Sequence, residues 1–148
     1  MSGASHSRTI AAPVEAIWEV LADFGSLSAW ADGVDHSCVM HNGEGVDPIG
    51  MSRRVQIGRD TFVETIVAFA PPRLLAYDIA GLPGGVSASN RWNLTPQDPG
   101  RTTVTLTSTA RTRIRPLQPM VERIAARLVA RRSRALLDSL ATQCEETR

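Results

Sequence analysis

Two segments in the second half of the chain alternate strictly between apolar and polar residues. In residues 86–94 one face carries Val86, Ala88, Asn90, Trp92 and Leu94. In residues 101–112 one face carries Val104, Leu106, Ser108 and Ala110, and the other is rich in threonine. A period of two belongs to β-strands that pack one face on a core and turn the other to water. The chain is therefore predicted to form an antiparallel sheet with one wet face.

A tight hairpin fixes the pairing of two further strands. Residues 51–57 and 60–69 are separated only by Gly58-Arg59, and glycine in the first position suits a type II′ turn. That turn places Arg53 opposite Glu64. Because opposite residues on one face of a sheet are close enough to interact, the sequence predicts an ion pair between these two side chains.

Two helices are predicted after a first strand over residues 4–11. Pro13 suits the first turn of a helix, where its missing N–H would have no partner. The core-facing residues of this helix are expected to be Val14, Ile17, Trp18, Leu21 and Ala22. Gly25 is expected to end it, and Ser26 to cap a short second helix that runs to Trp30.

A long helix is predicted over residues 116–145, because apolar residues recur there at helical spacing. The residues of that stripe are Leu117, Val121, Ile124, Leu128, Leu136 and Leu140. Further strands are predicted over residues 34–41 and 73–80, and a turn over residues 96–100. Strands in runs, with helices segregated to one face, are typical of α+β architecture.

Composition bounds the class of protein. At 148 residues the chain can bury a real core, and we expect one domain spanning residues 1–148. The net charge of +1 gives no overall attraction for nucleic acid, and no apolar run approaches the roughly 18 residues of a membrane span. The first residues lack a signal-peptide pattern, so a cytoplasmic location is expected. Cys38 and Cys144 have no metal-ligand spacing and are interpreted as free thiols.

Signals for metal, nucleotide or nucleic-acid chemistry are weak. Four residues of metal-ligand type cluster without the spacing of a tetrahedral site: Asp32, Asp35, His36 and His41. The chain has no HExxH, GxSxG, P-loop or dinucleotide glycine motif. We therefore expect no metal and no cofactor. Three arginines that recur every four residues on the long helix are interpreted as its solvated face: Arg123, Arg127 and Arg131.

Several motifs together resemble one superfamily. They are Ala12-Pro13…Trp18, Gly50-Met51-Ser52-Arg53, Glu64…Phe69…Pro71-Pro72-Arg73-Leu74…Tyr77 and Arg91-Trp92-Asn93-Leu94-Thr95-Pro96. With the terminal helix, they resemble the START/birch-pollen-allergen-like (SRPBCC) superfamily and its bacterial polyketide cyclase/dehydrase-like branch. The resemblance implies a helix-grip fold, in which a curved seven-stranded antiparallel sheet wraps around the C-terminal helix. It also implies a cavity for a small hydrophobic or aromatic ligand, such as a lipid or polyketide-like compound.

Arg53 and Glu64 are the sharpest candidates for chemistry. If both side chains point into the cavity, Arg53 can hold a ligand carbonyl or carboxylate, and Glu64 can act as a general base or orient the arginine. If they face outward, they form a surface ion pair that contributes only ~0–1 kcal/mol. The sequence leaves both arrangements open.

Four other residues are candidate ligand contacts. Asn90 is polar on an otherwise apolar strand face and can donate to a ligand oxygen. Tyr77 and Trp92 combine an apolar body with a polar tip, which suits a cavity wall as well as a core. The resemblance implies that Trp30 lies near the pocket mouth, although packing alone would also explain it.

Three functions follow from these residues. The leading hypothesis is binding of a small hydrophobic ligand oriented by Arg53, Asn90 or Tyr77, by a monomer or homodimer. The alternative is a polyketide cyclase/dehydratase, in which Glu64 or Tyr77 is the acid/base and Arg53 stabilises an enolate oxygen. The third is a protein-interaction module with a collapsed cavity and no ligand.

Overall fold

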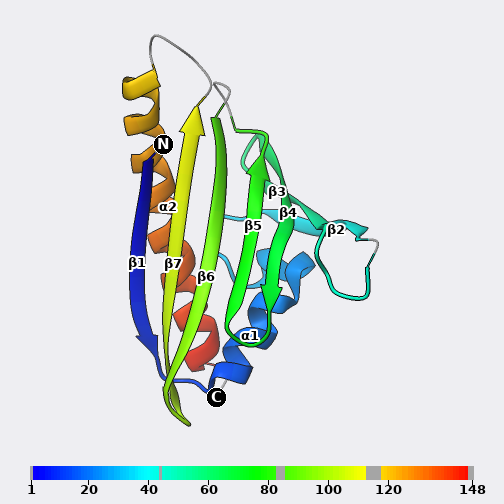
Figure 1. The fold of residues 1–148 in the computed structure, drawn as a ribbon, viewed down its shortest axis with the longest axis vertical. Coiled ribbons are helices and arrows are strands. Elements are labelled where there is room, and N and C mark those ends of the chain that lie inside the picture. The colour runs from blue at the N-terminus through cyan, green and yellow to red at the C-terminus, as the bar shows by residue number, and fades with distance from the viewer. Residues whose placement is uncertain (1, 44, 83–85, 113–117, 147–148) are drawn as a thin grey trace.

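The protein is a seven-stranded sheet folded around one long helix (Figure 1). The computed structural model describes residues 2–43, 45–82, 86–112 and 118–146. The strands are β1 (Ser2–Ile10), β2 (His36–Asn42), β3 (Met51–Ile57), β4 (Asp60–Ala70), β5 (Leu74–Ala80), β6 (Val86–Asp98) and β7 (Arg101–Thr112). The helices are α1 (Val14–Ala22), the 3₁₀ element η1 (Phe24–Ala29) and α2 (Gln118–Glu146).

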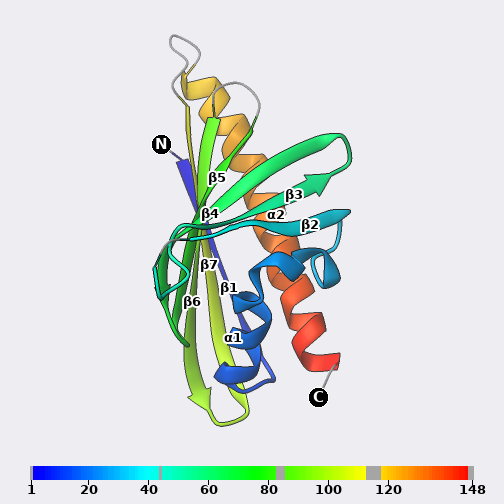
Figure 2. The same cartoon turned by 90° about the vertical axis from the view of Figure 1, so that its right-hand side faces the viewer.

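The sheet is antiparallel throughout, in the order β1-β7-β6-β5-β4-β3-β2. Helix α2 runs along its inner face, packs on β1 and β7, and contacts α1 (Figure 2). The strands β2, β3 and β4 curl away from the rest of the sheet and towards α2 (Figure 2). This arrangement confirms the predicted α+β helix-grip fold.

Burial follows the predicted alternation. On β6 and β7 the buried inward residues are Ala88, Asn90, Trp92, Leu94, Val104, Leu106, Ser108 and Ala110. The apolar core also includes residues of α1 and α2, namely Ile17, Leu21, Leu136, Leu140 and Ala141. Fully burying a side chain of the size of leucine stabilises the fold by about 1.5–3 kcal/mol. This layer therefore holds the sheet to α2.

The β3–β4 hairpin has the predicted register. Gly58 has a φ of +61°, which glycine adopts without strain, and Arg59 is not at positive φ, as a type II′ turn requires. Ile57 lies opposite Asp60, and Arg53 lies opposite Glu64. A slip by one residue would turn a strand's inward side chains to the outer face, so this turn determines which charges are buried.

The prediction that the apolar stripe of α2 packs into the core is wrong for part of the helix. Leu136 and Leu140 are buried, but Ile124 and Leu128 are 55% and 61% exposed. The side chains of Leu117 and Val121 lie outside the described residues. Leu128 lines the cavity described below, so this side of the helix faces an opening rather than a packed layer. Ile124 is exposed one helical turn before it, on the same side.

Two predicted boundaries also differ. The first helix ends at Ala22 rather than at Gly25, and η1 begins at Phe24. Ser26 lies inside η1, where its N–H donates to the carbonyl of Asp23 at 3.1 Å, so it is not an N-cap. Strand β6 continues through the predicted turn to Asp98, with a register shift after Pro96. Such an irregularity lets a strand tolerate a proline, which has no N–H to donate.

Candidate functional site

A cavity of about 280 Å³ lies between the inner face of the sheet and α2. Its wall is mostly apolar, formed by Leu27, Val55, Ile57, Phe62, Ile79, Leu82, Ala88, Leu128 and Leu136. The polar residues of the wall are Asp60, Glu64, Tyr77, Asn90, Arg132 and Ser133. An apolar hollow with a few polar groups is typical of small-molecule sites, and the volume of this one is just below their usual range of about 300–1,000 Å³.

Arg53 and Glu64 form the predicted ion pair, and it is buried. The residues are 3% and 8% exposed. The Nε of Arg53 donates to Oε1 of Glu64 at 2.7 Å, and its Nη2 lies 2.6 Å from the same oxygen. Both contacts end on Oε1, so Oε2 of Glu64 has no protein hydrogen bond within the described part of the chain. The inward arrangement is therefore the one that the fold adopts.

The Arg53 guanidinium is held on several sides. Its Nη1 donates to the carbonyl of Phe24 in η1 at 2.8 Å. Its central carbon lies 3.8 Å from the centre of the Phe24 ring and 4.8 Å from that of the Tyr77 ring, close enough for cation–π attraction. Arg53 does not belong to the described residues that line the cavity. Its contacts instead fix Glu64, which does line the cavity.

Tyr77 lines the cavity, and its buried hydroxyl keeps a proton that it can donate. The hydroxyl oxygen accepts hydrogen bonds from Nδ2 of Asn90 and Nε1 of Trp92, both at 3.2 Å. A hydroxyl has two acceptor lone pairs and one proton, so these bonds leave its O–H to donate. Burial, followed by the negative charge of Glu64, raises the pKa of Tyr77. The phenol thus stays neutral and keeps its proton.

Asn90 belongs to a chain of buried hydrogen bonds that ends on α2. Its Oδ1 accepts from Oγ of Ser108 at 2.6 Å, which fixes the amide so that Nδ2 faces Tyr77. The Ser108 hydroxyl also contacts the hydroxyl of Ser133. Buried polar groups need such partners, and a fully connected network holds its members in one geometry. The sequence indicated Asn90 but gave no sign of this connection to Ser133.

Arg132 is a cavity residue that the sequence analysis missed. It projects from α2, lines the cavity, and its Nη1 donates to the carbonyl of Asp32 at 3.0 Å. Burial lowers its pKa, and the negative charge of Glu64 opposes that shift. In the sequence it lies beside arginines of the polar face, and no periodicity separates it from them.

Trp30 and Trp92 are not among the described residues that line the cavity. Trp92 is buried and donates to Tyr77, so it positions a residue that does line the cavity. Trp30 is partly buried and packs edge-on against Trp92, with ring centres 6.4 Å apart. Direct ligand contact by these two residues stays a prediction.

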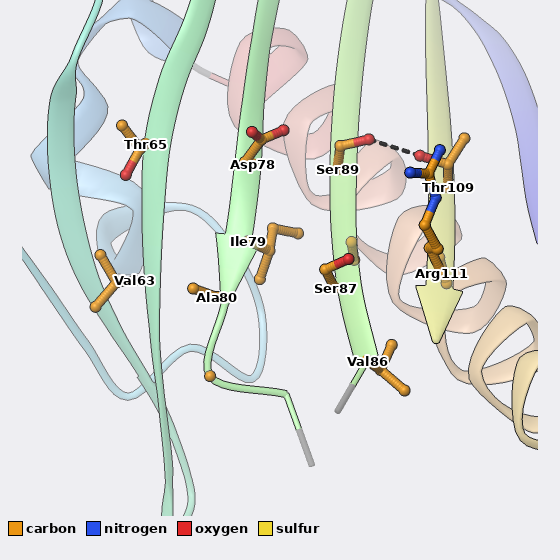
Figure 3. A pocket seen from close by; sticks show the side chains of 13 residues that line it. Val63, Thr65, Asp78, Ile79, Ala80, Val86, Ser87, Ser89, Thr109 and Arg111 are labelled. Carbon is orange, nitrogen blue, oxygen red and sulfur yellow. Dashed lines mark hydrogen bonds between the residues drawn. The ribbon is translucent and has the colours of Figure 1, made fainter. Parts of the chain in front are cut away.

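A larger hollow of about 730 Å³ lies on the outer face of the sheet (Figure 3). Its side chains include Thr65, Asp78, Ser87, Ser89 and Thr109, and the hydroxyls of the last two share a hydrogen bond of 2.6 Å. These are polar groups of the face that meets water. Volume favours this hollow, but the inner cavity has the apolar wall and buried polar groups of a ligand site. We therefore assign the candidate site to the inner cavity.

The residues considered for metal binding do not form a metal site in the described part of the chain. Oδ2 of Asp35 accepts from the N–H of Gly58 at 2.7 Å and so supports the β3–β4 turn. Within the described ranges, His, Cys, Asp and Glu side chains do not gather in groups of three or more that could hold a metal ion. Cys38 is exposed and Cys144 is buried, and both are free thiols. Helices long and apolar enough to cross a membrane are absent from the described residues.

The sequence matches one family model over residues 1–145, that of polyketide cyclase/dehydrase and lipid transport proteins. The chain belongs to this family. The predicted membership in the polyketide cyclase/dehydrase branch is thereby confirmed. No curated protein sequence matches the chain.

Solved structures of the same fold include two aromatase/cyclases. The aromatase/cyclase ZhuI from Streptomyces sp. R1128 has a TM-score of 0.78 at 24% identity, with 99% of this chain and 95% of that chain covered. The di-domain aromatase/cyclase BexL from the BE-7585A biosynthetic pathway has a TM-score of 0.79 at 16% identity, with 95% and 45% covered. A START superfamily protein from Mycobacterium smegmatis has a TM-score of 0.78 at 15% identity, with both chains fully covered. At these identities the likeness shows the fold, and the site must carry any functional argument.

Proposed function

We propose that this protein binds a small, largely apolar molecule of lipid or aromatic polyketide type in the cavity between the sheet and α2. The observation that carries the proposal is a mostly apolar, partly open cavity whose wall includes the buried Glu64, Tyr77 and Asn90. Burial of apolar ligand surface supplies the affinity, at about 25 cal/mol per Å². The family and the fold of the aromatase/cyclases support this class of ligand. A pure protein-interaction module would instead have a collapsed cavity.

Tyr77 orients the ligand in this proposal. Its two lone pairs are engaged by Asn90 and Trp92, so the O–H is directed to a ligand acceptor. A ligand with a carbonyl or ether oxygen near this hydroxyl satisfies it, whereas a pure hydrocarbon leaves it buried without a partner. An unsatisfied buried donor costs about 1–3 kcal/mol, so the cavity discriminates in favour of oxygenated ligands.

A second candidate function is that of a cyclase or dehydratase, and the inward position of Glu64 favours it. Oε2 of Glu64 can remove a proton from the carbon between two ligand carbonyls, and the electron pair passes into an enolate whose oxygen accepts from Tyr77. The enolate carbon then bonds to another carbonyl carbon of the same chain, whose oxygen takes the proton back from Glu64. Water is lost from that alcohol in a following step. Arg53 holds the carboxylate in position, and does not touch the enolate.

Native mass spectrometry of the protein as purified tests the binding function. We expect a bound mass that is released on denaturation and identified as an apolar compound with at least one oxygen. Tyr77→Phe, which removes only the hydroxyl, should bind the same compound more weakly. A clean unbound mass, together with no thermal shift across sterols, fatty acids and aromatic polyketides, would contradict the proposal.

Incubation of the protein with a synthetic poly-β-keto thioester separates the enzyme from the binding protein. An enzyme should speed loss of one water from the thioester, as followed by liquid chromatography and mass spectrometry. Glu64→Gln should abolish this acceleration while the variant still binds the thioester. If the wild type binds the thioester without accelerating the loss of water, the enzymatic candidate is refuted and the binding function stands.

A further inference from the structure

Arg132 places a positive charge at the cavity wall, and the proposed function assigns no role to this charge. The residue is partly buried and lines the cavity from α2. Its only hydrogen bond among the described residues runs from Nη1 to the carbonyl of Asp32. Ion pairs in the described part of the chain do not include it, so no described carboxylate lies within 4.0 Å of its guanidinium.

The two carboxylates of the cavity wall compensate this charge only in part, because neither lies within 4.0 Å of the guanidinium. Glu64 is already paired with Arg53 at 2.6 Å. Asp60 is exposed at the start of β4, where water and salt screen it. Taking a charge out of water without a partner is costly, and buried charges in proteins are normally paired. The cavity wall formed by α2 therefore carries a positive charge without a described carboxylate at ion-pair distance.

We propose that Arg132 binds the anionic oxygen group of the ligand while the apolar body of that ligand fills the cavity. This inference rests on the proposed function and adds a ligand class to it, that of an amphipathic anion such as an aromatic carboxylate. A guanidinium has five N–H donors, and Asp32 takes one, so a bidentate pair remains for a carboxylate.

The guanidinium is held in place before any ligand binds. The carbonyl of Asp32 accepts from Arg132, and the N–H of Asp32 donates to Oγ of Ser139 at 3.1 Å. Both contacts connect α2 to the segment that follows η1. Because the arginine is already oriented, less conformational freedom is lost when a ligand binds, which favours affinity.

The test compares two probes with the same apolar body, naphthoate and naphthamide, by isothermal titration calorimetry. We expect the wild type to bind naphthoate about tenfold or more tightly than naphthamide, as a charge-assisted hydrogen bond would give. Arg132→Gln should lose this preference while its affinity for naphthamide stays within about twofold of the wild type. Arg131→Gln, the matched control on the exposed face of α2, should keep the preference.

Each outcome bears on the role of Arg132 alone or on both proposals. Equal affinity of the wild type for the two probes, or a preference for naphthoate that survives Arg132→Gln, overturns the role of Arg132 and leaves the binding cavity intact. Failure of both probes to bind the wild type overturns the proposed cavity function as well. Arg132→Lys guards against a fold defect, because it keeps the charge without the bidentate geometry and should retain part of the preference. If Arg132→Lys binds naphthamide as the wild type does but shows no preference for naphthoate, the preference depends on the bidentate geometry of arginine and not on its positive charge alone, which supports the role of Arg132.

Discussion

Breaking the buried Arg53–Glu64 pair should cost far more stability than breaking a surface pair. Glu64→Gln leaves the Arg53 cation buried, but that cation keeps its bond to Phe24 and its two aromatic neighbours. We therefore expect a loss near the lower end of the 3–5 kcal/mol seen when one partner of a buried pair is removed, about 3 kcal/mol. Arg53→Met leaves the Glu64 carboxylate buried without its partner and also removes the Phe24 contacts. Its loss of stability should therefore be about 5 kcal/mol.

Urea unfolding followed by tryptophan fluorescence measures these losses. For a chain of this size they correspond to decreases in Tm of roughly 6–20 °C, at about 2–4 °C per kcal/mol. The double variant Arg53→Met/Glu64→Leu should lose less than the sum of the single variants, because no unpaired charge remains buried. Arg101→Met, which breaks the exposed pair with Asp98, is the matched control and should change the midpoint very little. Losses for Glu64→Gln no larger than for this control, or additive losses in the double variant, would refute the reasoning.

Three further predictions concern groups whose environments differ sharply. Tyr77 is the only tyrosine, so an ultraviolet absorbance titration reports its ionisation alone. The midpoint of this titration should lie above the ordinary pKa of about 10. The stability of the fold should decrease as pH rises through that range, because the unfolded chain releases the Tyr77 proton at a lower pH than the folded chain does. Burial raises the pKa of Cys144 to about 11, so a thiol reagent at mildly alkaline pH should label Cys38 quickly and Cys144 only after unfolding. Equal labelling rates would contradict this. Leu140→Ala should destabilise the fold by about 2–5 kcal/mol, whereas Leu128→Ala should cost less than about 1 kcal/mol in the same urea assay; equal costs would mean that α2 is packed along its whole length.

The sequence was sufficient to predict the sheet and the central ion pair, because both depend on local rules. Alternation assigned the inward face of β6 and β7, and the length of the Gly58-Arg59 turn set the register that places Arg53 opposite Glu64. Whether this pair is buried could not be predicted. That depends on the curvature of the sheet and on η1, whose Phe24 carbonyl accepts from Arg53.

The sequence failed where packing is set by distant elements. Ile124 and Leu128 share helical spacing with the buried Leu136 and Leu140, so periodicity alone assigns all four to the core. The structure exposes the first two because one side of α2 faces the cavity opening there. Arg132 was overlooked for the complementary reason. It lies among the arginines of the polar face, and only the folded structure shows that it lines the cavity.

Transfer of magnetisation between a bound ligand and the methyl groups of the protein tests the central claim most directly. With naphthoate as the ligand, we expect intermolecular nuclear Overhauser effects to the inward methyls of Val55 and Leu136, which line the cavity and not the outer hollow. The methyls of Val63, which line the outer hollow (Figure 3), should show none. Effects to Val63 without effects to the inward methyls would place the ligand on the wrong face of the sheet and contradict the account.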